Sequence, residues 1–149
     1  MLTFTFKPRK LSSAIAYLAE QKPGLTNHRI GALLFLADKQ HLLEFGRPIT
    51  GDRYYALKHG PEPEHGATQI MAQLDQVGPV DLKPLSKSDL NVLDAILLKF
   101  GTYKEHAAWL RTPPNQRIEF ELLFAGHPEA ELVKSILQEE QGSLVSKGQ

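Results

Sequence analysis

The chain contains no cysteine, and that absence excludes several kinds of site. Disulfide scaffolds, thiolate zinc centres, cysteine nucleophiles and iron–sulfur clusters all require thiols. The sequence also lacks any apolar run close to the roughly 18 consecutive residues of a membrane-spanning helix, and its first residues do not follow the pattern of a signal peptide. We therefore expect a cytoplasmic protein without a membrane partner.

The chain also has no formal net charge, because 17 basic residues balance 17 acidic ones. Proteins that bind nucleic acid broadly gain most of their affinity by neutralising phosphates with Lys and Arg. The balanced charge therefore disfavours nucleic acid as a partner. The one basic cluster in the sequence, Lys7, Arg9 and Lys10, is interpreted as the solvated start of a helix.

Length and composition indicate an ordinary globular chain. With 149 residues, 42% of them hydrophobic, we expect one domain over residues 1–149 with a frayed polar tail at 142–149. Apolar spacing predicts a mainly α fold, a single compact helical domain of about five to six helices with a few short strands. The helices are expected at residues 11–21, 26–45, 64–77, 86–100, 102–110 and from 128 onward. Strands are expected at 2–6 and 53–58, and the alternating residues 117–124 are suited to pair with 2–6.

Residues 33–61 are the most hydrophobic and most sharply punctuated part of the chain. Apolar side chains cover nearly every side of the helix at residues 30–37, which places this helix at the centre of the domain. Gly46 is expected to end it, and the glycine- and proline-rich residues 46–52 to form a turn. Gly60 and Pro61 are expected to end the strand that follows.

No motif for catalysis or for phosphate binding occurs in the sequence. The serines lie outside the G-x-S-x-G and S-x-x-K patterns, and there is no glycine-rich phosphate loop. Asp38 and His41 are three residues apart on one helix, so a metal-assisted hydrolase that uses them with Asp52 and His59 is an alternative function. No HExxH or HxH pattern supports it. The other interpretation is a half-buried ion pair or hydrogen bond that holds the helix end against the segment at Tyr54, and we expect no catalytic residues, metal or cofactor.

Aromatic, charged and rigid residues follow the turn. Tyr54, Tyr55, Lys58 and His59 precede the Gly60-Pro61 step, and such side chains on a stiff support are typical of interface hot spots. The alternative is that both tyrosines simply contact the central helix. The residues by themselves leave these two interpretations open.

Residues 33–63 read LLFLADKQHLLEFGRPITGDRYYALKHGPEP and resemble the signature of the Panacea domain, the SocA-like antitoxin domain also found in phage-associated proteins. The signature joins an apolar helix to Ala-Asp, a histidine, the block GRPITGD, an aromatic residue and a GP turn. The resemblance covers roughly residues 11–109. The matching residues are Phe35, Ala37, Asp38, His41, Gly46, Arg47, Pro48, Ile49, Gly51, Asp52, Tyr54, Ala56, Lys58, Gly60 and Pro61.

This resemblance implies a mostly helical domain that acts as an antitoxin. Such a protein binds and neutralises a cognate toxin, or delivers that toxin to a protease, and no catalytic residues carry over. A phage accessory protein with another partner is a further alternative. We assign partner binding to Arg47, Asp52, Tyr54, Tyr55, Lys58, His59 and Pro61, and a structural role in the signature to Asp38, His41, Gly46, Pro48, Gly51 and Gly60.

Two segments depart from the family pattern. Residues 110–114 lack the histidine that family members usually carry there, and residues 117–124 do not resemble the family. Any family property that depends on that histidine is therefore not expected of this chain.

Overall fold

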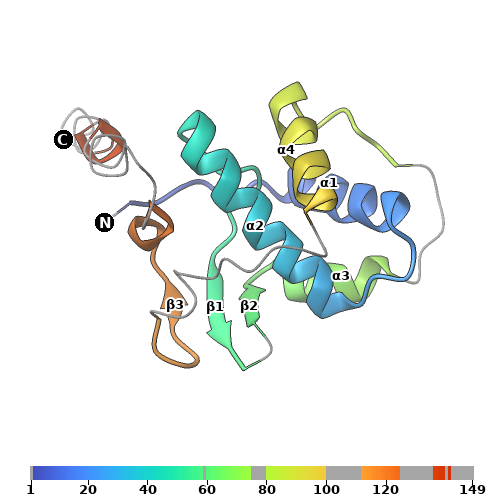
Figure 1. The fold of residues 1–149 in the computed structure, drawn as a ribbon, viewed down its shortest axis with the longest axis horizontal. Coiled ribbons are helices and arrows are strands. Elements are labelled where there is room, and N and C mark those ends of the chain that lie inside the picture. Colours follow the sequence, from blue (N-terminus) through green and yellow to red (C-terminus); the bar gives the residue numbers. More distant parts are fainter. Residues whose placement is uncertain are drawn as a thin grey trace.

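A computed structural model describes residues 2–58, 60–74, 80–99, 112–124, 136–139 and 141. Within these ranges the chain is mainly helical and carries a small antiparallel sheet (Figure 1). The sheet has the strand order β2-β1-β3. The elements are α1 (Pro8–Gln21), α2 (Asn27–Phe45), β1 (Tyr54–Leu57), β2 (Gly60–Pro63), α3 (Gly66–Gln73), α4 (Lys87–Leu98), β3 (Arg117–Ile118) and the 3-10 helix η1 (Phe120–Phe124).

α2 is the central helix, as its apolar sequence predicts. The Thr26 side chain caps its first turn by accepting a hydrogen bond from the Arg29 N–H at 3.2 Å. Gly46 ends it in the left-handed conformation, with φ of 78°, which favours glycine. Figure 1 shows α2 crossing the middle of the molecule, with α1, α3, α4 and the sheet around it. The predicted helix and both of its ends are confirmed.

The other two long helices begin at recognisable local signals. α4 starts at Ser86, whose side chain and that of Asp89 form a reciprocal capping box, as predicted. α1 starts at Pro8, three residues before the predicted residue 11. Proline is favoured at this first helical position because its missing N–H has no partner there.

β2 is a strand that the sequence pattern did not predict. β1 ends at Leu57, before Gly60 and Pro61 as expected, and the chain then turns back, so that Tyr54 pairs with Pro63 and Ala56 with Pro61. The Glu64 N–H donates to the Arg53 carbonyl at 2.7 Å, and hydrogen-bonded pairs alternate along an antiparallel ladder. Both prolines therefore occupy positions that need no N–H toward β1, which is how an edge strand accommodates proline.

The predicted strand at residues 2–6 is wrong, although its alternation is correct. Leu2 is buried and Thr3 and Thr5 are exposed, but no ladder forms. The segment is instead held by side chains: the Gln141 amide exchanges two hydrogen bonds with the Thr3 backbone, at 3.0 and 2.8 Å. The alternating residues 117–124 also do not pair with it, because β3 pairs with β1 and the chain then turns into η1.

Several predicted features lie outside the described residues, namely the helix at 102–110, the start of the last helix at 128, and the tail at 142–149. Residues 136–139 of that last helix are helical. Among the residues that the structure describes, no helix combines the length and apolar character needed to cross a bilayer.

Candidate functional site

Asp38 lies on α2 and is buried, with 1% of its surface exposed. One carboxylate oxygen accepts a hydrogen bond from the Thr50 N–H at 2.8 Å, and the other accepts the Thr50 and Tyr54 hydroxyls, each at 2.6 Å. Burial raises the pKa of Asp38 to about 6, although the hydrogen bonds from Thr50 and Tyr54 limit the rise. This carboxyl therefore ties α2 both to the turn at residues 46–52 and to β1.

His41 lies one turn further along α2 and joins it to two other segments. Its Nδ1 is 2.6 Å from the Arg47 carbonyl oxygen, and its Nε2 is 2.8 Å from Ser88 Oγ on α4. A carbonyl only accepts, so Nδ1 carries a proton, and Nε2 also lies 3.2 Å from Asp89 Oδ1. Burial lowers the pKa of His41, although its hydrogen bond to the Arg47 carbonyl raises it.

Asp89 places a buried carboxylate at the start of α4. It accepts hydrogen bonds from Lys10 Nζ at 2.7 Å, from the Arg47 guanidinium at 3.2 Å and from the Ser86 N–H at 2.8 Å. Burial by itself raises the pKa of Asp89, but the Lys10 and Ser86 hydrogen bonds and the charges of Lys10 and Arg47 outweigh it, and the pKa lies below 3.8. The carboxylate thereby connects α1, the turn after α2, and α4.

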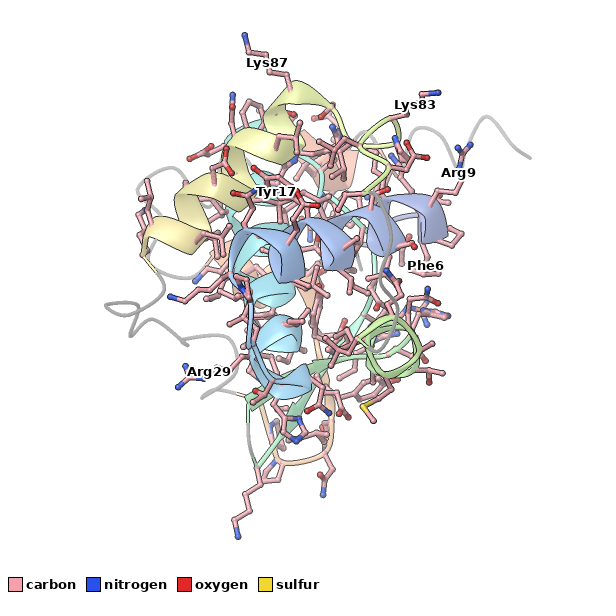
Figure 2. The ribbon with its side chains drawn as sticks, turned by 90° about the vertical axis from the view of Figure 1, so that its right-hand side faces the viewer. Phe6, Arg9, Tyr17, Arg29, Lys83 and Lys87 are labelled. Atoms are coloured by element: carbon pink, nitrogen blue, oxygen red, sulfur yellow. The ribbon has the colours of Figure 1, made fainter. Side chains whose placement is uncertain are left out.

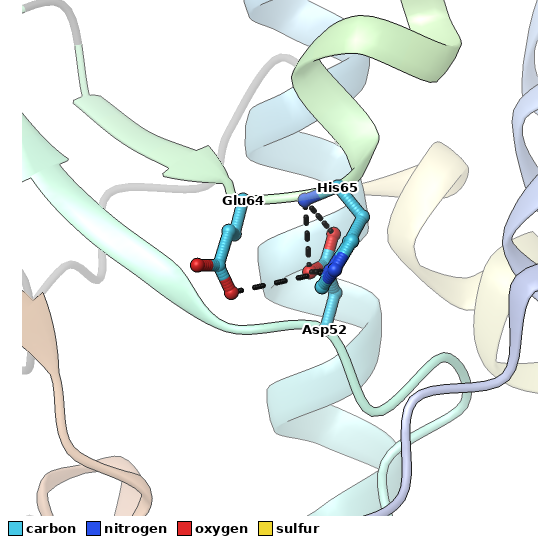
Figure 3. A group of neighbouring side chains, drawn as sticks. All are labelled: Asp52, Glu64 and His65. Carbon is cyan, nitrogen blue, oxygen red and sulfur yellow. Dashed lines mark hydrogen bonds and ion pairs between the residues drawn. The ribbon is translucent and has the colours of Figure 1, made fainter.

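Asp52 caps the start of α3 (Figure 3). Its side chain is buried and accepts the backbone N–H groups of Arg53 at 2.9 Å and Gly66 at 2.8 Å. It also accepts the His65 N–H at 3.1 Å and the His65 ring nitrogen Nδ1 at 2.9 Å. These donors include the first N–H groups of α3, which have no partner inside the helix.

The metal site considered from the sequence is not assembled in the described part of the chain. Asp38 and His41 are occupied by separate partners, and His59 lies outside the described residues. Within the described ranges, a different trio has ligand atoms within 4.8 Å of one another, namely Asp52, Glu64 and His65. That trio does not fit a cation, because Asp52 already accepts four N–H donors and faces the positive end of the α3 dipole.

Three residues that we assigned to partner binding are buried. Asp52 is 1% exposed and Tyr54 is 3% exposed, and Pro61 is buried in β2. The Tyr54 ring contacts Phe35 of α2 edge-on, with centroids 5.2 Å apart. Side chains alternate along β1, and that of Tyr54 points toward the core. Tyr54 is therefore a core residue and not an interface residue.

The remaining assigned residues differ in accessibility. Arg47 is partly exposed, but its guanidinium bonds to Asp89 and Ser86. Lys58 is exposed just beyond the end of β1, and Tyr55 is half-buried. Among the residues assigned a structural role, Pro48 is buried in the turn at residues 46–52, and Gly60 is buried in β2.

The outward face of the sheet groups residues that sequence reasoning did not combine. Tyr55 lies between Glu62 of β2 and Arg117 of β3 in the register. Leu57 follows Tyr55 on the same face, and Arg53 is exposed just before β1. The sequence did not indicate this grouping, because the segment that carries Arg117 was expected to pair with residues 2–6 and not with β1. This outward face, with Lys58 at its end, is called the sheet face below.

A groove of about 350 Å³ runs along the other side of β2. α2 and α3 form its walls, and Gly31 allows the close approach of Pro63, whose Cδ lies 3.1 Å from the position of an added Cβ. The exposed Met71 lies at its rim.

One of the comparisons with known proteins gives a match. The family Antitoxin SocA-like, Panacea domain matches residues 33–108, just over half of the chain. The match begins within α2 and includes the turn, the β1–β2 hairpin, α3 and α4. Neither the curated proteins nor the solved structures give a match. The chain therefore belongs to the SocA-like antitoxin family and carries its Panacea domain.

Proposed function

We propose that this protein is an antitoxin that binds and neutralises a cognate protein toxin, and that the sheet face makes the contact. The observation that carries the proposal is the division of β1 into two sides. Tyr54 faces the core and Tyr55 faces outward between charged neighbours on both flanking strands. Family membership supports a protein partner.

The sheet face has the composition of an interface core. Tyr55 and Arg117 are of the residue types that dominate hot spots, and Glu62 and Lys58 supply charges that select a partner. Behind the face, the Asp38–Tyr54 hydrogen bond fixes β1 to α2. A face held in place in this way loses little conformational entropy on binding.

Neutralisation has two physical forms in this proposal. The antitoxin either covers the functional surface of the toxin, or it holds the toxin while a protease degrades it. In the second form the toxin level in cells falls with a half-life that depends on the antitoxin. In the first form the toxin is stable but inactive.

The test is co-purification with the product of the neighbouring gene. The variant Tyr55→Thr/Lys58→Glu replaces an aromatic residue with a β-branched one that also favours a strand, so its unfolding free energy is expected to change by about 1 kcal/mol or less. Its capture of the partner is expected to fall at least about tenfold. The matched control is Tyr54→Phe, which loses the hydroxyl that bonds Asp38 and about 1–3 kcal/mol of stability, but keeps its capture when folded.

The reverse result contradicts the placement of the interface. If Tyr54→Phe weakens capture while the folded Tyr55→Thr/Lys58→Glu variant binds as well as the wild type, the sheet face is not the contact. Absence of any captured partner from the wild type contradicts the antitoxin function itself.

A further inference from the structure

Six basic side chains from three separate segments lie where α1 and α4 begin. Three of them lie at residues 7–10 around the start of α1, one lies in the turn after α2, and two lie in the loop before α4 and at the first residue of α4. We call this set the basic patch. It consists of Lys7, Arg9, Lys10, Arg47, Lys83 and Lys87.

Contacts place these segments next to one another. Lys10 and Arg47 bind the same Asp89 carboxylate, at 2.7 and 3.2 Å. Burial lowers the pKa of Lys7, and the charges of Lys10 and Arg47 lower it further, so these three cations repel one another at short range. The loop that carries Lys83 is held to α1 by the hydrogen bond from Ser13 Oγ to the Asp81 carbonyl at 2.7 Å.

The two helices start at the same end of the molecule. Lys10 contacts Asp89 near both helix starts, and Tyr17 donates to Asp94 further along both helices, so α1 and α4 run in the same general direction. Their positive dipole ends therefore add to the charge of the side chains. α1 has no acidic residue in its first turn, and Lys and Arg at that end oppose its stability.

Most of this charge faces outward. Asp89 neutralises part of the charge of Lys10 and Arg47, but it is buried beneath them. Arg9, Lys83 and Lys87 are exposed, and Figure 2 shows their side chains projecting away from the ribbon. The exposed carboxylate of Asp81 accepts the Lys83 backbone N–H at 3.1 Å and offsets one charge. The patch is thus positive on a protein whose formal net charge is zero.

We propose that the basic patch is a second docking surface, which binds an acidic segment of the protein partner. This inference rests on the proposed antitoxin function for the identity of that partner. An acidic segment is favoured over nucleic acid because Lys10 and Arg47 already pair with Asp89, which leaves few cations to neutralise phosphates, and nucleic-acid affinity depends on many such contacts. Short-range pairing with carboxylates, in contrast, needs only the local charge and strengthens association and partner selection.

A short oligoglutamate peptide tests the patch directly, with fluorescence anisotropy as the measurement. The wild type is expected to bind it with an affinity that decreases as salt is added. The variant Arg9→Glu/Lys83→Glu/Lys87→Glu changes exposed side chains and leaves Lys10 and Arg47 on Asp89. Its affinity is expected to fall at least about tenfold.

The matched control has the same net charge change at other sites. Lys22, Arg29 and Lys99 are exposed and lie at other helix ends, and the triple change of these residues to Glu also lowers the net charge by six. This control is expected to keep its affinity within about twofold of the wild type. Circular dichroism of both variants verifies that they are folded.

Three results of the binding assay would overturn the inference: no binding of the peptide by the wild type, an equal loss in the control, or tighter binding of a single-stranded oligodeoxynucleotide that depends on the same three residues. The last result assigns the patch to nucleic acid. The peptide assay needs no toxin, so it stands apart from the co-purification test. If the patch variant still captures the neighbouring gene product fully, the second docking surface is wrong and the antitoxin function is unaffected.

Discussion

Asp38 illustrates what the polar residues of the signature do individually. Its carboxylate accepts three hydrogen bonds from the turn and from β1, and it has no access to solvent. His41 and Asp52 are used in the same manner, each joining its own segment to another. From the sequence, all three residues could be ligands of a metal site. In the structure they instead join separate segments by internal hydrogen bonds.

The raised pKa of Asp38 makes the stability depend on pH. The native carboxyl, with a pKa of about 6, holds its proton more tightly than the unfolded one at 3.8, so the native state is stabilised as pH falls toward 4 and loses that stability as pH rises through 6. The effect is at most about 3 kcal/mol, since one pKa unit corresponds to about 1.36 kcal/mol. Urea unfolding between about pH 4.5 and about pH 7.5 measures it.

Asp38→Asn is the control that isolates this carboxyl. The lowered pKa of His41 produces the opposite slope, because a buried neutral histidine loses stability as pH falls below 6.5. The unfolding free energy of the wild type minus that of Asp38→Asn cancels the histidine contribution. This difference is expected to increase as pH falls, and a constant difference would show that the native carboxyl titrates at its ordinary pKa.

Among the elements, the turn at residues 46–52 determines how β1 meets α2. Gly51 has φ of 74° and lies against the N-terminal segment, where an added Cβ would be 2.2 Å from the Thr5 carbonyl oxygen. The Thr5 carbonyl belongs to the backbone, which cannot move aside as easily as the end of a flexible side chain. The glycine is thus required both for its conformation and for its lack of a side chain.

Gly51→Ala is expected to destabilise the protein by more than about 3 kcal/mol, because it combines backbone strain with a backbone clash. Gly24→Ala is the matched control. Gly24 has φ of 90° but no atom within 4 Å of the added Cβ, so its substitution is expected to lose only about 1–2 kcal/mol of stability. Similar losses for both variants, measured by urea unfolding, would mean that the contact with Thr5 is relieved at little cost.

The elements also show where local sequence signals suffice. α2 and α4 begin at side chains that cap them, and α2 ends at Gly46; such signals lie within a few residues of each helix end. β2 could not be predicted in the same way. Whether Pro61 and Pro63 are tolerated depends on which N–H positions face β1, and the register of the hairpin decides that.

At the scale of the whole molecule, the N-terminal segment connects distant parts of the chain. The Leu2 N–H donates a hydrogen bond to Glu121 Oε1 at 2.8 Å, and the Thr3 N–H donates one to the Gln141 side chain. The ring centroids of Phe4 and Phe120 are 4.9 Å apart. Hydrophobic contacts and side-chain hydrogen bonds hold the segment in place without a ladder.

Leu2→Ala tests the contribution of this segment. Leu2 is 1% exposed, so the substitution is expected to lower the unfolding free energy by about 2–4 kcal/mol. Leu98→Ala is the matched control, since Leu98 is 88% exposed and its loss is expected to change stability by no more than about 0.5 kcal/mol. Equal effects in chemical denaturation would indicate that the segment detaches from the core in solution.

Sequence alone determined the central helix, its caps, the family signature and the absence of thiol chemistry, because these depend on neighbouring residues or on composition. Tertiary structure decided which of the adjacent Tyr54 and Tyr55 is core, which strand Arg117 joins, and that Lys83 and Lys87 lie beside the basic start of α1. The physical reason is that side-chain accessibility and local charge depend on contacts between segments far apart in the chain. A linear pattern fixes periodicity, but it does not specify which distant segment will cover a given face.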